Sequence, residues 1–87
     1  MSTEMIFEDC REEVKRFAVR MEAKLRENDH KGGWSRMTNS ELVYRLLQEF
    51  SELTKTLNDG SGSRDIQNEC ADVANFAMMI ADNQRAK

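Results

Sequence analysis

Apolar residues recur at three- and four-residue steps in three stretches of the chain, which is the spacing of one face of an α-helix. The first stretch carries Ile6, Cys10, Val14, Phe17, Met21 and Leu25. These residues predict a helix from about residue 4 to residue 27. Similar periodicity predicts a second helix over 38–57 and a third over 64–83. The pattern therefore predicts an all-α fold.

Glycines mark the joints between these helices. The chain has no proline, and its four glycines lie in two short segments, 32–33 and 60–62. Gly60 suits a left-handed cap at the end of the second helix. Thr38 and Glu41 have the capping-box spacing that begins the same helix. The short connection between the second and third helices favours an antiparallel pair.

The length of the chain permits a single domain, which spans residues 1–87. A chain of this size buries only about 60% of the surface that its unfolded form exposes. Apolar residues such as Val43, Leu47 and Met78 also lie off the main apolar faces. We therefore expect antiparallel helical hairpins that form a four-helix-bundle-like core, completed by homo-oligomerisation to a dimer or tetramer.

Charge and hydropathy argue against two classes of partner. The 13 basic and 16 acidic residues give a net charge of −3, and the basic residues are spread along the chain. This distribution disfavours binding to a nucleic acid polymer. The longest apolar stretch, residues 73–81, is far shorter than the roughly 20 residues of a membrane span. With neither a secretory leader nor a cysteine framework, the sequence predicts a soluble cytoplasmic protein.

Acidic residues interrupt the apolar arcs of the second and third helices. The arc of the second helix comprises Leu42, Leu46, Phe50, Leu53 and Leu57. The arc of the third helix comprises Ile66, Val73, Phe76, Ala77 and Ile80. At about 100° per residue, Glu49 abuts the first arc, and Glu52 lies about 60° to the other side of Glu49. Glu69 falls inside the second arc, and Asp72 projects between two apolar residues of the same helix.

Burying such carboxylates together is costly, because each loses hydration and like charges repel. A cation relieves both costs, and oxygen-only ligation suits Mg²⁺, with Mn²⁺ as the alternative. Zinc is disfavoured, since His30 is the only histidine. The sequence therefore predicts a metal site formed by Glu49, Glu52, Glu69 and Asp72. The alternative is that the carboxylates bend out to water, or that Lys55 and Arg45 neutralise them.

These acids resemble the motif of the MazG-like all-α nucleoside triphosphate pyrophosphohydrolases, which reads Glu-Glu-x-x-Glu and, further along, Glu-x-x-Asp. Here residues 48–52 read Gln-Glu-Phe-Ser-Glu and residues 69–72 read Glu-Cys-Ala-Asp. The resemblance covers about residues 31–82. It implies Mg²⁺-dependent hydrolysis of a ribo- or deoxynucleoside triphosphate to the monophosphate and pyrophosphate. It also implies that the four acids ligate Mg²⁺ and that Glu49 and Glu52 are catalytic.

Gln48 departs from the family pattern, which usually has a glutamate at this place. A neutral amide neither accepts a proton nor balances a second metal ion. This leaves open a second interpretation, a non-catalytic or weakly active relative that binds nucleotide and metal. A third is a structural helical oligomer whose acidic residues never bind a metal.

Four further residues are candidates for contact with the nucleotide. Lys31 and Lys55 can contact phosphate, and Trp34 can stack on a base. For Trp34 the alternative is a packing role at the end of the bundle. Asn75 lies one turn beyond Asp72 and can hydrogen-bond a phosphate or a sugar hydroxyl. Its alternative is a hydrogen bond to a neighbouring helix.

Overall fold

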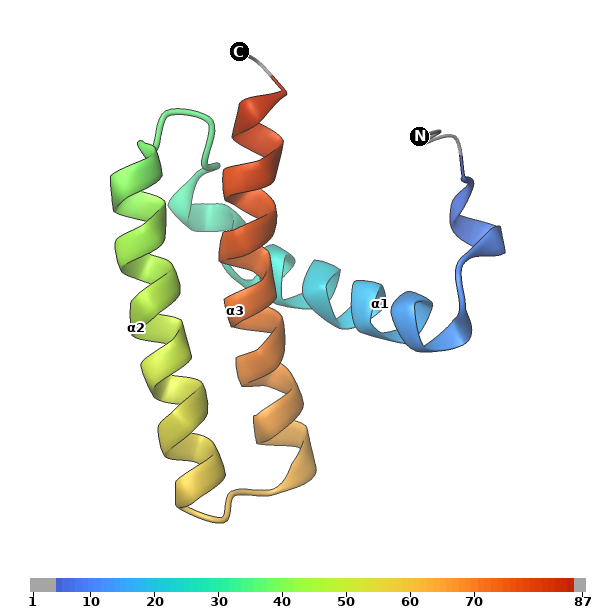
Figure 1. The fold of residues 1–87 in the computed structure, drawn as a ribbon, viewed down its shortest axis with the longest axis vertical. Helices are drawn as coiled ribbons and strands as arrows, with labels where there is room; N and C mark the ends of the chain where they lie inside the picture. Colours follow the sequence, from blue (N-terminus) through green and yellow to red (C-terminus); the bar gives the residue numbers. More distant parts are fainter. Residues whose placement is uncertain (1–4, 86–87) are drawn as a thin grey trace.

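The computed structural model describes residues 5–85, which form helices and their connections without any strand. The elements are a 3₁₀ turn at Phe7–Asp9, α1 at Glu12–Glu27, a second 3₁₀ turn at Asp29–Lys31, α2 at Asn39–Asn58 and α3 at Ser63–Gln84. Figure 1 shows α2 and α3 side by side as an antiparallel hairpin, with α1 crossing α3 at a steep angle. The predicted all-α class and the predicted hairpin are confirmed. No helix in this part of the chain combines the length and apolar character that crossing a bilayer requires.

Local hydrogen bonds define both ends of α2. The Thr38 hydroxyl accepts the Glu41 N–H at 3.1 Å, and the Glu41 carboxylate accepts the Thr38 N–H at 2.9 Å. The predicted capping box is therefore present. Because that amide donates to the carboxylate, the pKa of Glu41 lies below its usual value. At the other end Gly60 has a φ of 69°, as predicted for a left-handed cap.

The Thr38 cap offers a direct test of this local structure. Thr38→Ala is expected to lower the free energy of unfolding by about 1 kcal/mol, because the Glu41 N–H loses its acceptor. Urea unfolding at a fixed protein concentration measures the difference. Ser35→Ala, at an exposed position in the preceding connection, is the matched control and should leave the midpoint unchanged. Equal midpoints for both variants would contradict a stabilising role for the cap.

The predicted start of the first helix is wrong. Residue 4 lies outside the described residues, but α1 begins only at Glu12, and Cys10 and Arg11 are extended, with ψ values of 151° and 153°. A helix continued back from Glu12 would run away from α3, because the start of α1 is the end of this helix that lies farther from α3 (Figure 1). It would therefore gain no packing against α3. Helices in proteins gain most of their stability from such packing. The apolar period at Ile6 and Cys10 was therefore insufficient to extend the helix.

The core of the single chain is small. Only Leu42 and Ala71 are fully buried apolar residues among those described. Phe50 and Leu57, predicted to be buried, are 57% and 54% exposed, and Ala77 is exposed as well. In this part of the chain α2 packs extensively only against α3. One neighbour covers one side of a helix, so part of each predicted arc remains in solvent.

Candidate metal centre

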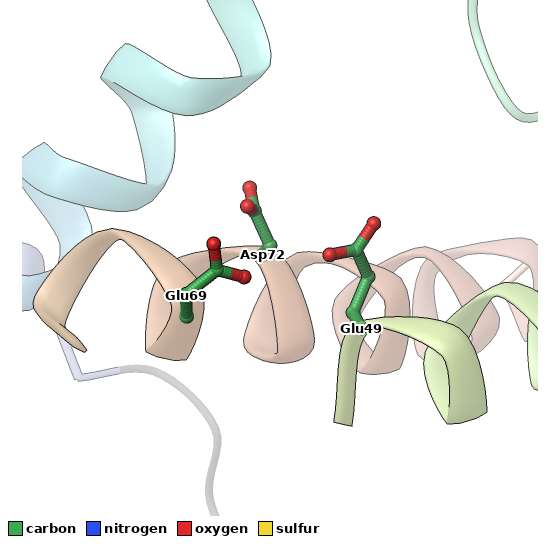
Figure 2. Close-up of side chains that lie close together, drawn as sticks. All are labelled: Glu49, Glu69 and Asp72. Carbon is green, nitrogen blue, oxygen red and sulfur yellow. The ribbon is translucent and has the colours of Figure 1, made fainter. Parts of the chain in front are cut away.

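Three carboxylates converge on one side of the α2–α3 hairpin. Glu49 comes from α2, whereas Glu69 and Asp72 lie one turn apart on α3. One oxygen of each lies within 4.8 Å of an oxygen of the other two. Figure 2 shows the three side chains pointing toward the side on which α1 lies. Three of the four predicted ligands are thus brought together by the fold.

Glu52 does not belong to this group of three. Its side chain is exposed on α2, one turn beyond Glu49. It is nevertheless close enough for its charge to raise the pKa of Glu49 and of Glu69. The structure therefore places Glu52 at the edge of the cluster rather than among the converging oxygens.

Burial and mutual repulsion disfavour the charged forms of all three carboxylates. For Glu49, loss of hydration raises the pKa most, followed by the charges of Asp72 and Glu69. For Glu69, loss of hydration again comes first and the charge of Asp72 second. Loss of hydration also raises the pKa of Asp72, against the opposing effect of Lys24. The cluster therefore retains protons to a higher pH than free carboxylates do.

Two basic side chains face the cluster but do not fully compensate its charge. Lys24 Nζ lies 3.9 Å from Asp72 Oδ1, and Arg45 Nη2 lies 3.8 Å from Glu49 Oε1. Both distances exceed the 2.7–2.9 Å of a charge-assisted hydrogen bond. Glu69 Oε2 is buried and has no hydrogen-bond partner. This buried acceptor and the long ion pairs show that the negative charge of the cluster is not fully compensated, and a further cation could balance it.

Arg45 was foreseen from the sequence as a neutralising residue, but Lys24 was not. Lys24 comes from α1, far from the acidic residues in the sequence. Its side chain lies only about 60° from Met21 around the helix, at the edge of the predicted apolar arc. The acidic residues were selected because they lie at or inside an apolar arc. Lys24 lies at the edge of an apolar arc as well, so the same criterion applied to the sequence would have selected it.

The donor set is compatible with a hard divalent cation. All three side chains offer carboxylate oxygens, which are the ligands that Mg²⁺ and Mn²⁺ prefer. Neighbouring and opposite ligand oxygens around Mg²⁺ lie about 3–4 Å apart, whereas here the separations extend to 4.8 Å. A modest side-chain adjustment would close the group around an ion. Three protein ligands leave coordination positions for water or phosphate oxygens.

A cleft of about 420 Å³ adjoins the cluster. It lies between the end of α1, the connection to α2, and the two hairpin helices, and this volume is in the range of small-ligand sites. Its lining includes Glu49, Asp72, Lys24, Lys31, Trp34, Arg45, Asn75 and Phe76. Three of the predicted nucleotide contacts, Lys31, Trp34 and Asn75, thus lie beside two of the carboxylates. Lys55 lies elsewhere, in a shallow hollow that includes Phe50 and Asn58.

Trp34 has a clear packing role. Its Nε1 donates to Asp82 Oδ2 at 3.0 Å, and its carbonyl accepts Asn83 Nδ2 at 3.0 Å. Both partners belong to the last turns of α3, so Trp34 fixes the connection between α1 and α2 to that helix. The predicted packing role is confirmed. Trp34 also lines the cleft, so its contact with a base stays a prediction.

Asn75 is the most deeply buried polar residue among those described, at 3% exposure. Its Nδ2 donates to the Met21 carbonyl of α1 at 3.0 Å, which confirms the predicted hydrogen bond to a neighbouring helix. Its Oδ1 is buried without a partner. Because the nitrogen is engaged, Asn75 is left with an acceptor for a ligand. It therefore suits a sugar hydroxyl or a base N–H better than a phosphate oxygen.

Comparison of the chain with protein-family models, with curated proteins and with solved structures gave no significant match.

Proposed function

We propose that this chain is a Mg²⁺-dependent nucleoside triphosphate pyrophosphohydrolase that converts a ribo- or deoxynucleoside triphosphate to the monophosphate and pyrophosphate. The observation that carries the proposal is the convergence of Glu49, Glu69 and Asp72 at one cleft. These residues come from the two segments that resemble the MazG motif, and that resemblance supplies the reaction class. Membership of the MazG-like superfamily is part of the same proposal.

The residues around the cleft have separable roles in this proposal. A divalent cation bound by the three carboxylates would neutralise phosphate charge and favour deprotonation of a water molecule. Lys31 and Arg45 bind phosphate oxygens, and Trp34 contacts the base. Glu52 lies outside the converging group and accepts the proton of the attacking water. The water oxygen bonds to phosphorus as the bond to the departing pyrophosphate breaks.

The proposal includes a homo-oligomer, dimer or tetramer, in which a second copy completes a four-helix-bundle-like core. The small core and the exposed apolar residues of α2 support this homo-oligomer.

A cytoplasmic location fits the two free cysteines, because thiols stay reduced in that compartment.

The decisive experiment is a screen of the purified protein with Mg²⁺ and each common ribo- and deoxynucleoside triphosphate. We expect at least one substrate to give pyrophosphate and the monophosphate in equal amounts. Removal of the metal with a chelator should stop the reaction, and added Mg²⁺ should restore it. Release of orthophosphate instead, or no product from any nucleotide, would contradict the proposed reaction.

Gln48 favours one second candidate, a relative that binds nucleotide and metal without turnover. Gln48 is exposed on α2, so a neutral amide stands at the position where the family pattern has an acid. If nucleotide binds in the presence of Mg²⁺ but no pyrophosphate appears, this candidate is favoured. Gln48→Glu should then introduce measurable pyrophosphate release.

A further inference from the structure

Lys24 is a largely buried lysine in the lining of the cleft. It lies in the last turn of α1, and its side chain is only 19% exposed. Its Nζ lies 3.2 Å from Glu27 Oε1 and 3.9 Å from Asp72 Oδ1. Among the described residues, it is the only basic side chain paired with carboxylates of two different helices. One ammonium group therefore connects a surface glutamate with a candidate metal ligand, and all three residues line the cleft.

The two contacts of Lys24 differ in strength. Glu27 lies on the same helix, its side chain is 63% exposed, and it forms the shorter of the two contacts. Asp72 lies on α3 and forms the longer one. The ammonium of a lysine is a compact charge on a flexible stem, and its three donors can rotate. The ammonium can therefore move away from Asp72 while it stays bound to Glu27.

An ammonium beside Asp72 opposes the binding of a divalent cation to the same carboxylate. Mg²⁺ approaches its oxygen ligands to about 2.0–2.1 Å, so the ion and the ammonium would be close neighbours. In water, two unit charges about 4 Å apart change a binding constant about fivefold, and the double charge of the ion increases this effect. Lys24 thus offsets the charge of the metal-free cluster, and it does so at the expense of metal affinity.

A ligand of the cleft can receive the displaced ammonium. Asn75 is 3% exposed and lines the same cleft, and its Oδ1 has no hydrogen-bond partner. This unpartnered acceptor indicates that a bound molecule completes the cleft. Phosphate oxygens that bind a metal ion lie next to the carboxylates that hold it, and lysine commonly binds phosphate. Lys24, already beside Asp72, is therefore within reach of such a phosphate.

We propose that Lys24 competes with the divalent cation for Asp72 in the free chain and binds the triphosphate of the substrate once that cation is bound. This inference rests on the proposed function, because it requires both a metal site and a triphosphate. Glu27 is a positioning residue that keeps the ammonium beside the cluster. Lys24 then weakens binding of the metal alone and strengthens binding of the triphosphate, so the two ligands bind cooperatively.

Binding of Mn²⁺ alone to the nucleotide-free protein tests the competition. Lys24→Gln should tighten Mn²⁺ binding by at least about fivefold, because the competing charge is removed. Lys15→Gln is the matched control. Lys15 lies on the same helix, its Nζ is 3.3 Å from Glu12 Oε1, its side chain is 24% exposed, and it lies outside the cleft lining. It should leave Mn²⁺ affinity unchanged. Electron paramagnetic resonance of free Mn²⁺ measures the affinity, and unchanged or weaker binding in Lys24→Gln would overturn the proposal.

Binding of inorganic tripolyphosphate at saturating Mg²⁺ tests the second role. Tripolyphosphate carries the phosphates that all nucleoside triphosphates share. By calorimetry, Lys24→Gln should bind it at least about tenfold more weakly than the wild type, because a hydrogen bond to a charged group is lost. Lys24→Arg keeps the charge and should retain most of this binding. A lysine that only held α1 against α3 would lower stability when replaced, without tightening Mn²⁺ binding. Equal tripolyphosphate affinity in Lys24→Gln and the wild type would overturn the proposal.

A measurement on the wild-type protein applies even if Lys24→Gln fails to fold. Lysines are acetylated with N-hydroxysuccinimide acetate, and mass spectrometry gives the rate at Lys24 relative to Lys15 in the same molecule. Mg²⁺ should raise this ratio, because Lys24 is released from Asp72, and tripolyphosphate with Mg²⁺ should lower it again. A constant ratio would overturn the proposal. None of these measurements requires turnover, so a nucleotide screen without pyrophosphate and a failure of the Lys24 exchange are separate results.

Discussion

Asp72→Asn is expected to lower the rate of pyrophosphate release by at least about a hundredfold. Loss of groups that merely support a metal ligand commonly reduces metal affinity or activity by about 10–100-fold, and loss of a ligand should cost at least as much. Asp72 lies within 4.8 Å of both other carboxylates and lines the cleft. Asparagine has the shape of aspartate without the charge, so the loss of rate reports the contribution of the Asp72 charge. The rate of pyrophosphate release at saturating and at limiting Mg²⁺ measures this loss.

The same substitution should not destabilise the metal-free protein. Asp72 repels Glu49 and Glu69, and its charge raises the pKa of both. Removing that charge relieves the repulsion, so the free energy of unfolding at neutral pH should rise or stay the same. Opposite signs for activity and stability distinguish a ligand from a structural residue. Reduced activity that accompanies reduced stability would instead assign Asp72 a structural role.

Two further variants sharpen this test. Asp59→Asn makes the same chemical change at an exposed position just after α2, outside the cleft lining, and should retain wild-type activity. Glu49→Gln should lose activity to a similar extent as Asp72→Asn. Combining Glu49→Gln with Asp72→Asn should cost little more than either alone, because groups that act as one unit are not additive. Full additivity would contradict a shared ion.

The second large effect expected is stabilisation of the protein by divalent cations. A ligand that binds only the folded state at a hundred times its dissociation constant adds about 2.7 kcal/mol to the free energy of unfolding. For a chain of this length that corresponds to a rise of roughly 10–20 °C in Tm. Thermal unfolding with Mg²⁺ or Mn²⁺ at a fixed protein concentration measures the shift. The Asp72→Asn protein should show a much smaller one.

The pH dependence of the metal-free protein follows from the raised pKa values of Glu49, Glu69 and Asp72. Between the unfolded and folded pKa values of such a group, the folded state holds more protons than the unfolded state. The stability that each group contributes is therefore fully present below its unfolded pKa, 4.5 for the glutamates and 3.8 for the aspartate. It is lost as the pH rises through the higher folded pKa. Bound metal should offset this loss, so its stabilising effect should be greatest at neutral pH.

The contribution of these three groups can be isolated by difference. Urea unfolding across the acid-to-neutral range is compared for the wild-type protein and a variant with Glu49→Gln, Glu69→Gln and Asp72→Asn. The free energy of unfolding of the wild type should fall more steeply with rising pH than that of the variant. Parallel curves, together with an unchanged Tm in metal, would show that the cluster is neither strained nor a metal site.

Residue types and their spacing were enough to predict the features that depend on neighbouring residues. Thr38 and Glu41 cap α2 through hydrogen bonds that span three residues, and Gly60 ends it with a left-handed backbone. Three periodic stretches gave three helices, and a short connection made two of them antiparallel. The convergence of Glu49 with Glu69 and Asp72 followed from the same hairpin, because the register of an antiparallel pair places such positions opposite one another.

Features that depend on contacts between distant parts of the chain emerged only from the packing of the helices. The crossing of α1 over α3 brought Lys24 to Asp72 and Met21 to Asn75. The lack of packing against α3 beyond Glu12 ended α1 early among the described residues, and the single neighbour of α2 left Phe50 exposed. Periodicity shows which face of a helix is apolar. Whether that face is buried depends on the position of the other helices, because burial requires a surface to cover it.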